Sequence, residues 1–75
     1  MKHPLIERNP DVLLGKPIIK GTRISVELLM RKLAGGFSID ELLEQYPHIS
    51  KEQVQAAFLY AADMIANTLE LETAA

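Results

Sequence analysis

Apolar positions in the second two thirds of the chain follow the spacing of helices, and each helical segment begins with the same arrangement. A serine follows an apolar residue, and another apolar residue stands four positions after the serine. The serine hydroxyl can accept from first-turn amides, and the apolar pair packs across the cap. Glu41 and Gln53 complete two capping boxes. With the serines Ser25, Ser38 and Ser50 as caps, and Gly35-Gly36 and Pro47 as stops, we expect helices near residues 26–34, 39–46 and 51–69.

Residues 1–24 have the pattern of a short β arm. Ile18 and Ile19 favour a pleated backbone, Pro17 biases the preceding residue towards an extended conformation, and Gly21 can take a positive φ. A strand near residues 18–20 should therefore turn at Lys20-Gly21-Thr22. A second strand near residues 5–8 is ended by the turn residues Asn9-Pro10-Asp11. We expect a two-stranded ribbon or an extended arm.

The fold class expected from these elements is a mainly α, three-helix bundle with a short N-terminal β arm or hairpin. All 75 residues fit one domain, 1–75. The tight turn Pro47-His48-Ile49 between the last two helices is similar to that of a helix-turn-helix. However, Lys51 is the only basic residue from position 51 to the end, against four acidic ones. A recognition helix needs basic side chains, so any DNA binding would depend on the front half of the chain.

The chain has more apolar residues than a body this small can easily bury. Their share is 48%, whereas a domain of about 60 residues buries only about 60% of its unfolded surface. The third helix has an inward stripe, and further apolar residues widen it. We expect self-association or a partner protein to cover the excess, although central burial in the bundle is the alternative. The candidate interface residues are Ile18, Ile19, Leu59, Tyr60 and Met64, and the inward stripe is Val54, Ala57, Phe58, Ala61, Ile65 and Leu69.

Charge is divided between a basic front and an acidic back. Residues 1–32 contain seven basic and three acidic side chains, a net of +4, and residues 33–75 contain one basic and seven acidic, a net of −6. A basic arm can bind phosphates, and an acidic face can bind a basic groove. Local roles compete with these, because the helix dipole favours cations in a last turn and Arg23 can pair with Glu27 or cap carbonyls. The candidate DNA or phosphate ligands are Lys16, Lys20, Arg23, Arg31 and Lys32.

The residue types do not favour a catalytic site or a metal site. There is no cysteine, and the two histidines, His3 and His48, have no third ligand at metal spacing. Gly15 to Thr22 departs from a phosphate loop because no lysine follows the second glycine. We therefore expect no enzyme, no metal, no cofactor and no small-molecule substrate. Without a signal peptide pattern or an apolar run of bilayer length, we also expect a cytoplasmic protein and no membrane contact.

The stretch from about Leu5 to Ala62 resembles the domain of unknown function 433 family. The resemblance is carried by an Asn-Pro, a Gly-Lys-Pro, a Gly-Thr-Arg-Ile, a glycine after the first helix, a Tyr-Pro, and a Glu-Gln-Val that leads into Ala-Ala. The signature positions are Asn9, Pro10, Gly15, Pro17, Gly21, Thr22, Arg23, Tyr46 and Pro47. Whether these residues are structural or functional is left open by the sequence.

The resemblance implies a homeodomain-like fold and a place among VapB-like antitoxins, which are thought to inhibit a PIN-like ribonuclease toxin by binding it. No catalytic residues are attributed to the family. The leading hypothesis is therefore a non-enzymatic antitoxin subunit whose third helix and arm contact the toxin. The alternative is a dimeric DNA-binding regulator or autorepressor, and a third possibility is an adaptor with neither activity.

Overall fold

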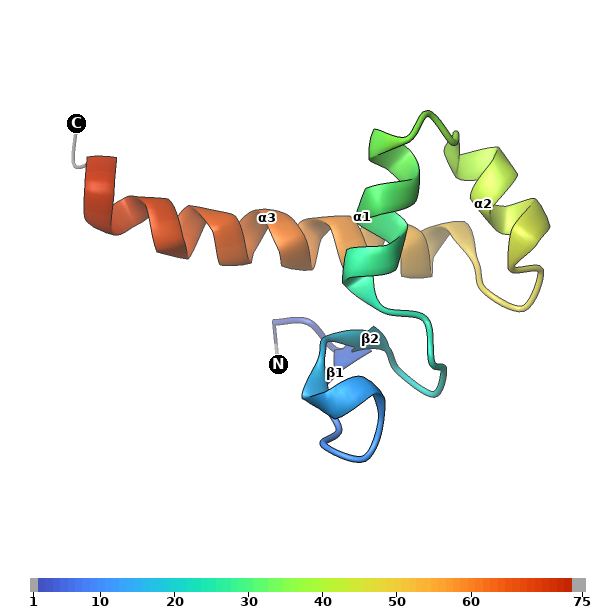
Figure 1. The fold of residues 1–75 in the computed structure, drawn as a ribbon, viewed down its shortest axis with the longest axis horizontal. Helices are drawn as coiled ribbons and strands as arrows, with labels where there is room; N and C mark the ends of the chain where they lie inside the picture. The colour runs from blue at the N-terminus through green and yellow to red at the C-terminus, as the bar shows by residue number, and fades with distance from the viewer. Residues whose placement is uncertain (1, 74–75) are drawn as a thin grey trace.

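The computed structural model describes residues 2–73, and the side chains up to residue 67. Its elements are strand β1 (Ile6–Glu7), the 3-10 turn η1 (Leu13–Gly15), strand β2 (Ile18–Ile19) and helices α1 (Val26–Ala34), α2 (Ile39–Gln45) and α3 (Lys51–Thr73). A two-stranded hairpin followed by three helices confirms the expected fold class (Figure 1). No helix within residues 2–73 has the length and apolarity needed to cross a membrane.

The serine caps stand where the sequence places them. Ser25 Oγ accepts a hydrogen bond from the Leu28 amide at 2.9 Å. Ser38 forms a reciprocal box with Glu41 through bonds of 3.1 and 2.8 Å. Ser50 and Gln53 form a second box, with bonds of 3.2 and 2.7 Å. These boxes satisfy amides that a helix start would otherwise leave unpaired, which fixes where the last two helices begin.

Two helix ends differ from the predicted ones. The second helix ends at Gln45 rather than at residue 46, because Tyr46 precedes Pro47 and takes a non-helical conformation with φ −124° and ψ 72°. The third helix continues to Thr73 rather than to residue 69. No glycine or proline lies between residues 70 and 73 to end it.

The hairpin is part of the core and not a free arm. Ile6 pairs with Ile19 and Glu7 with Ile18, and a further bridge joins Ile18 to Ser25. Ile18 and Ile19 are 1% and 0% exposed, and Ile19 belongs to the apolar cluster that contains Leu29 of α1. Their assignment as interface residues is therefore wrong, because strand pairing on one side and helix packing on the other already cover them.

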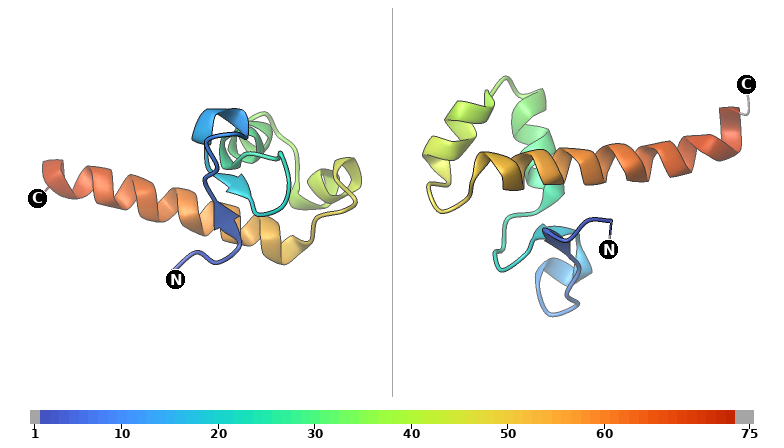
Figure 2. Two further views of the ribbon diagram at one scale, coloured as in Figure 1. Left: turned by 90° about the horizontal axis from the view of Figure 1, so that it is seen from below. Right: turned by 180° about the vertical axis from the view of Figure 1, so that it is seen from behind.

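Helix α3 extends well beyond the other elements. Its first half packs against α1, α2 and the hairpin, whereas its far end projects past them in all three views (Figures 1 and 2). Val54 and Ala57 are fully buried, but Ile65, predicted to lie on the same inward stripe, is 55% exposed. The prediction for Ile65 is wrong because the body ends before the helix does. The side chain of Leu69, also assigned to that stripe, lies outside the described residues.

Candidate functional site

The Gly-Thr-Arg corner is a hydrogen-bonded turn that follows β2 and leads to the bridge between Ser25 and Ile18. Thr22 Oγ1 donates to the Ile19 carbonyl at 2.8 Å and accepts from the Ile24 amide at 3.0 Å. The Thr22 amide also donates to the Ile19 carbonyl, at 3.0 Å. Gly21 has φ +81°, a value that suits glycine. The signature residues Gly21 and Thr22 are thus used to build the backbone.

Other signature residues have similar structural contacts. Asn9 Oδ1 accepts from the Asp11 amide at 2.9 Å, and the Asn9 carbonyl accepts from the Val12 amide at 2.9 Å. The Pro17 carbonyl accepts from the Val26 amide at 3.0 Å, which ties the hairpin to the first residue of α1. Gly15 has φ +81°. These contacts give the turn residues a structural role that their spacing alone does not reveal.

Glu27 on α1 holds two of the candidate phosphate ligands. Lys16 Nζ lies 2.9 Å from one carboxylate oxygen and Arg31 Nε lies 3.0 Å from the other. Hydrogen bonds from Lys16 and Arg31, together with their charges, lower the pKa of the Glu27 carboxyl below its ordinary value of 4.5. The pairing that the sequence suggested, Arg23 with Glu27, is replaced by these two ion pairs. Part of the positive charge expected on this surface is therefore neutralised within the chain.

The remaining candidate cations are Lys20, Arg23 and Lys32, and none of them pairs with Glu27. Lys32 Nζ lies 4.9 Å from the centre of the Phe37 ring and 5.9 Å from that of Tyr46, a cation–π arrangement beside the end of α1. Lys20 and Arg23 are exposed on the segment that turns out of β2. The five candidate cations thus do not form one cluster: Lys16 and Arg31 meet at Glu27, Lys32 lies beside Phe37 and Tyr46, and Lys20 and Arg23 are on the turn that follows β2.

A shallow apolar groove of about 380 Å³ lies where α3 leaves the body, and we call it the α3 groove. Its apolar lining comes from the start of α1, from Pro17 and from the middle of α3, and Arg8 and Glu27 lie at its rim. Met64 and Ile65 on its α3 side are 41% and 55% exposed. The apolar residues that line it are Pro17, Val26, Met30, Ala61, Met64 and Ile65.

Tyr60 is anchored at the edge of this groove by the N-terminal segment. Arg8 donates to Tyr60 Oη from Nε at 3.2 Å and from Nη2 at 3.0 Å. The His3 ring meets the Tyr60 ring edge-on at 5.1 Å between centroids, and His3 Nε2 lies 3.0 Å from Asp63 Oδ2. Tyr60, expected at an interface, is therefore half-buried by the chain itself while still lining the α3 groove.

Leu59 is separated from the other interface candidates. It is 56% exposed, and it does not line the α3 groove. At about 100° per residue, Leu59 stands on the opposite side of α3 from the buried Ala57, whereas Met64 lies close to the side of Ala57. The sequence grouped Leu59 with Tyr60 and Met64, but the helix presents them on different faces.

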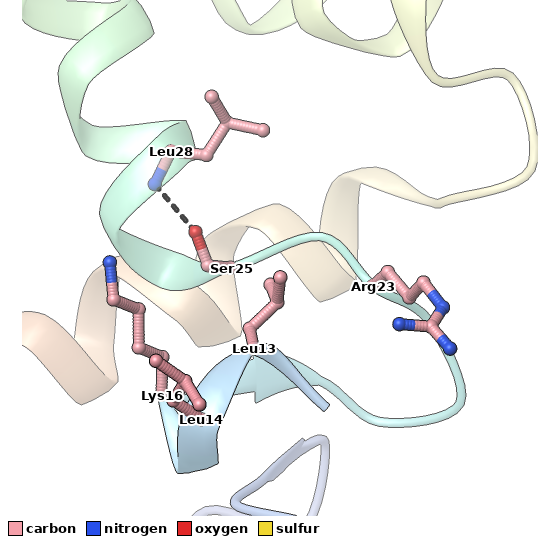
Figure 3. Close-up of a pocket in the computed structure, with 6 residues that line it drawn as sticks. All are labelled: Leu13, Leu14, Lys16, Arg23, Ser25 and Leu28. Atoms are coloured by element: carbon pink, nitrogen blue, oxygen red, sulfur yellow. Dashed lines mark hydrogen bonds between the residues drawn. The ribbon is translucent and has the colours of Figure 1, made fainter. Parts of the chain in front are cut away.

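A second hollow, of about 460 Å³, opens beside η1 at the start of α1, and we call it the leucine hollow (Figure 3). Leu13, Leu14 and Leu28 provide its apolar surface, and Lys16 and Arg23 line it as well. Leu13 and Leu14 have φ values of 50° and 58°, in the left-handed region that costs a non-glycine residue about 1 kcal/mol or more. This turn could not be recognised from the residue types, because leucine is not a usual left-handed residue.

The described residues contain no group of three or more histidine, aspartate or glutamate side chains that could hold a metal ion. Asp40, Glu41 and Glu44 are exposed on or near the first turns of α2. Glu41 is occupied by its capping box.

The architecture defines a small, mainly helical domain with an N-terminal antiparallel hairpin. The profile of the family described as "Protein of unknown function (DUF433)" matches residues 6–61. The chain belongs to this family.

Two known proteins are similar to this chain. An uncharacterized protein, y4eO, from Sinorhizobium fredii (strain NBRC 101917 / NGR234) is 33% identical over 57 residues, which is 76% of this chain and 26% of that protein. The chain thus spans about a quarter of the length of that curated relative. The crystal structure of a DUF433 member protein from Anabaena variabilis is 31% identical, with a TM-score of 0.76 over 95% of this chain and 69% of that one.

Proposed function

We propose that this domain is a non-enzymatic binding protein, an antitoxin subunit that binds and inhibits a ribonuclease toxin of PIN-like fold. The observation that supports a binding role is the α3 groove, where Ile65 remains 55% exposed at the point where the helix leaves the body. Apolar grooves with charged rims are common binding sites for amphipathic segments. The identity of the partner rests on the family resemblance.

Covering the α3 groove would contribute a useful part of the free energy of binding. Complete burial of an isoleucine side chain contributes about 1.5–3 kcal/mol, so covering the exposed half of Ile65 contributes about 1 kcal/mol. Met30 and Met64 add to the same apolar surface, and thioether side chains adapt to the shape of a partner. The rim cation Arg8 is held by Tyr60 beside this surface.

Acidic side chains provide the second element of the proposal. Asp40 and Glu44 on α2 and Glu52 at the start of α3 are exposed, and they belong to the half of the chain with a net charge of −6. Exposed carboxylates of this kind would favour encounter with the basic, RNA-binding groove of a nuclease. Inhibition would then come from occupying the groove that the RNA needs.

The test is co-expression of this chain with the protein encoded by the adjacent gene, followed by purification and assay of RNA cleavage. Ile65→Glu should weaken the complex by at least about fivefold, because it places an unpaired carboxylate in the apolar contact. Leu59→Glu is the matched control, since it makes the same change at a 56% exposed position of the same helix that does not line the α3 groove. An Ile65→Glu protein that folds, binds and inhibits like the unchanged chain would refute the assignment of this groove.

A second copy of the chain is the competing occupant of the same groove. The chain would then be a homodimer in dilute solution, and a mass measurement by light scattering detects this directly. If Ile65→Glu converts a dimer to a monomer without affecting partner binding, the α3 groove serves self-association instead.

The alternative function is DNA binding by a regulator or autorepressor with a helix-turn-helix. The exposed Lys20 and Arg23 on the turn after β2 favour it, whereas the pairing of Lys16 and Arg31 with Glu27 reduces the charge available. If only two phosphates are contacted, the log–log salt slope of binding should be about −1.8. A mobility shift with the upstream DNA that is abolished by Lys20→Gln and Arg23→Gln would support this role, and no shift at low salt would exclude it.

A further inference from the structure

The leucine hollow is a second surface, distinct from the α3 groove, and the proposed function does not use it. We propose that it binds an acidic amphipathic segment of a partner protein, with an apolar side chain against Leu13, Leu14 and Leu28 and a carboxylate on Arg23. This proposal is independent of the antitoxin assignment.

The first observation is the exposure of Leu14 on a fixed backbone. Its side chain is 94% exposed, and it stands in a turn where Leu13, Leu14 and Gly15 have φ values of 50°, 58° and 81°. The turn is closed by hydrogen bonds from the Gly15 amide to the Val12 carbonyl and from the Lys16 amide to the Leu13 carbonyl, both 3.1 Å. The fold therefore holds a large apolar side chain in solvent, in a conformation that glycine or asparagine would adopt more easily.

The second observation is the charge around the leucines. Lys16 and Arg23 stand on opposite sides of Leu13 (Figure 3), and no acidic residue is among the described residues that line the hollow. Lys16 forms an ion pair with Glu27. The Arg23 side chain, in contrast, has no ion pair or hydrogen bond with the described residues. The guanidinium group is thus available to bind a carboxylate with two parallel hydrogen bonds.

The combination of these features selects the kind of occupant. A hollow of about 460 Å³ falls within the range of about 300–1,000 Å³ that is usual for binding sites. A nucleic acid phosphate would use the cations but would leave Leu14 and Leu28 without an apolar contact. A purely apolar peptide would leave Arg23 unpaired. A segment with leucine-type side chains beside glutamates or aspartates satisfies both parts, and this is the usual pattern of an amphipathic helix that binds in a groove.

The test uses the full chain, labelled with ¹⁵N, and a short synthetic peptide with leucine at helical spacing and glutamate between the leucines. The expected result is a set of amide shifts confined to residues 13–16 and 23–28. One control peptide has lysine in place of glutamate, and another has alanine in place of leucine. Both control peptides should bind at least about fivefold more weakly, since each lacks one half of the recognised chemistry.

Variants of the protein complete the test. Leu14→Gly should lower the affinity for the glutamate–leucine peptide by about tenfold or more, because it removes an apolar contact. The melting temperature should be unchanged or higher, because glycine suits the backbone there. Arg23→Gln should lower the affinity for the same peptide by about two- to fivefold. Leu59→Ala, an exposed leucine on α3, is the control and should leave the affinity unchanged.

Three outcomes would overturn the proposal. The first is the absence of any shift at the hollow with the glutamate–leucine peptide, or equal binding of the lysine peptide. The second is unchanged affinity together with a lower melting temperature in Leu14→Gly, which would make Leu14 a structural residue. The third is a stronger and salt-sensitive shift of the same amides by duplex DNA, which would assign the cations to nucleic acid.

Discussion

Replacement of Thr22 by valine tests whether the Gly-Thr-Arg corner acts through the fold. Valine has nearly the same shape as threonine but lacks the hydroxyl that donates to the Ile19 carbonyl at 2.8 Å and accepts from the Ile24 amide at 3.0 Å. The Ile19 carbonyl keeps its bond from the Thr22 amide, so the Ile24 amide is the group that loses its partner.

A part-buried amide left without a partner costs about 1–3 kcal/mol. In a domain of this size, each kcal/mol lowers the melting temperature by about 4–8 °C. We therefore expect Thr22→Val to melt at least about 4 °C lower, as measured by circular dichroism at the helical signal. Thr22→Ser, which retains the hydroxyl, should lower the melting temperature by less than half as much.

The same proteins should then be compared for binding at a temperature where all are folded. Equal affinity for the partner, together with the lower melting temperature, is the result that a structural role requires. A Thr22→Val protein as stable as the unchanged chain, but unable to bind its partner or DNA, would show that the hydroxyl is a binding group and would refute the reasoning.

Three further changes test other parts of the fold. Ile19→Ala should lower the free energy of unfolding by about 2–5 kcal/mol in urea titrations, since Ile19 is fully buried, whereas a surface residue would cost less than about 0.5 kcal/mol. Gly21→Ala should lower the melting temperature by a few degrees, because alanine at φ +81° costs about 1 kcal/mol, and an unchanged melt would contradict that conformation. Because Lys16 and Arg31 lower the pKa of Glu27 in the folded chain, Glu27 stabilises the fold above pH 4.5, and this contribution is lost as the pH falls through the lower, folded value. Glu27→Gln should therefore flatten the dependence of unfolding free energy on pH in that range, and an identical slope in both proteins would disprove the ion pairs.

The helices could be predicted from the sequence because their starts are encoded locally. A cap and its box involve residues only three apart, and both boxes form at the serines that the pattern identified. The turn at Lys20-Gly21-Thr22, after β2, could be predicted for the same reason. In each case the partners are neighbours along the chain, so composition and spacing contain the information.

The division of apolar residues between core and surface could not be predicted. Two adjacent isoleucines in a strand should point to opposite faces, yet Ile18 and Ile19 are both buried because β2 lies between β1, the bridge to Ser25 and the helices. The exposure of Ile65 depends on where the body ends relative to α3, which no local pattern specifies.

The candidate site shows the same limit. The pair of Glu27 with Arg31 has the four-residue spacing that a helix brings together, so that spacing could have identified it. The pair of Glu27 with Lys16 depends on tertiary structure, as does the leucine hollow. Left-handed values at Leu13 and Leu14 could not be predicted either, since the only glycine in the turn is Gly15.

The contact of Arg8 with Tyr60 joins residues 52 positions apart, so it can form only after most of α3 has been made. As the ribosome releases the chain from its N-terminus, the two strands emerge long before the helix that covers them. A lone pair of short strands is barely stable in water, so Ile6 and Ile19 lack the part of their cover that Val54 and Ala57 belong to until the last helix has been made. Cotranslational folding can therefore produce isolated helical turns, but the finished domain forms only after Tyr60 leaves the exit tunnel.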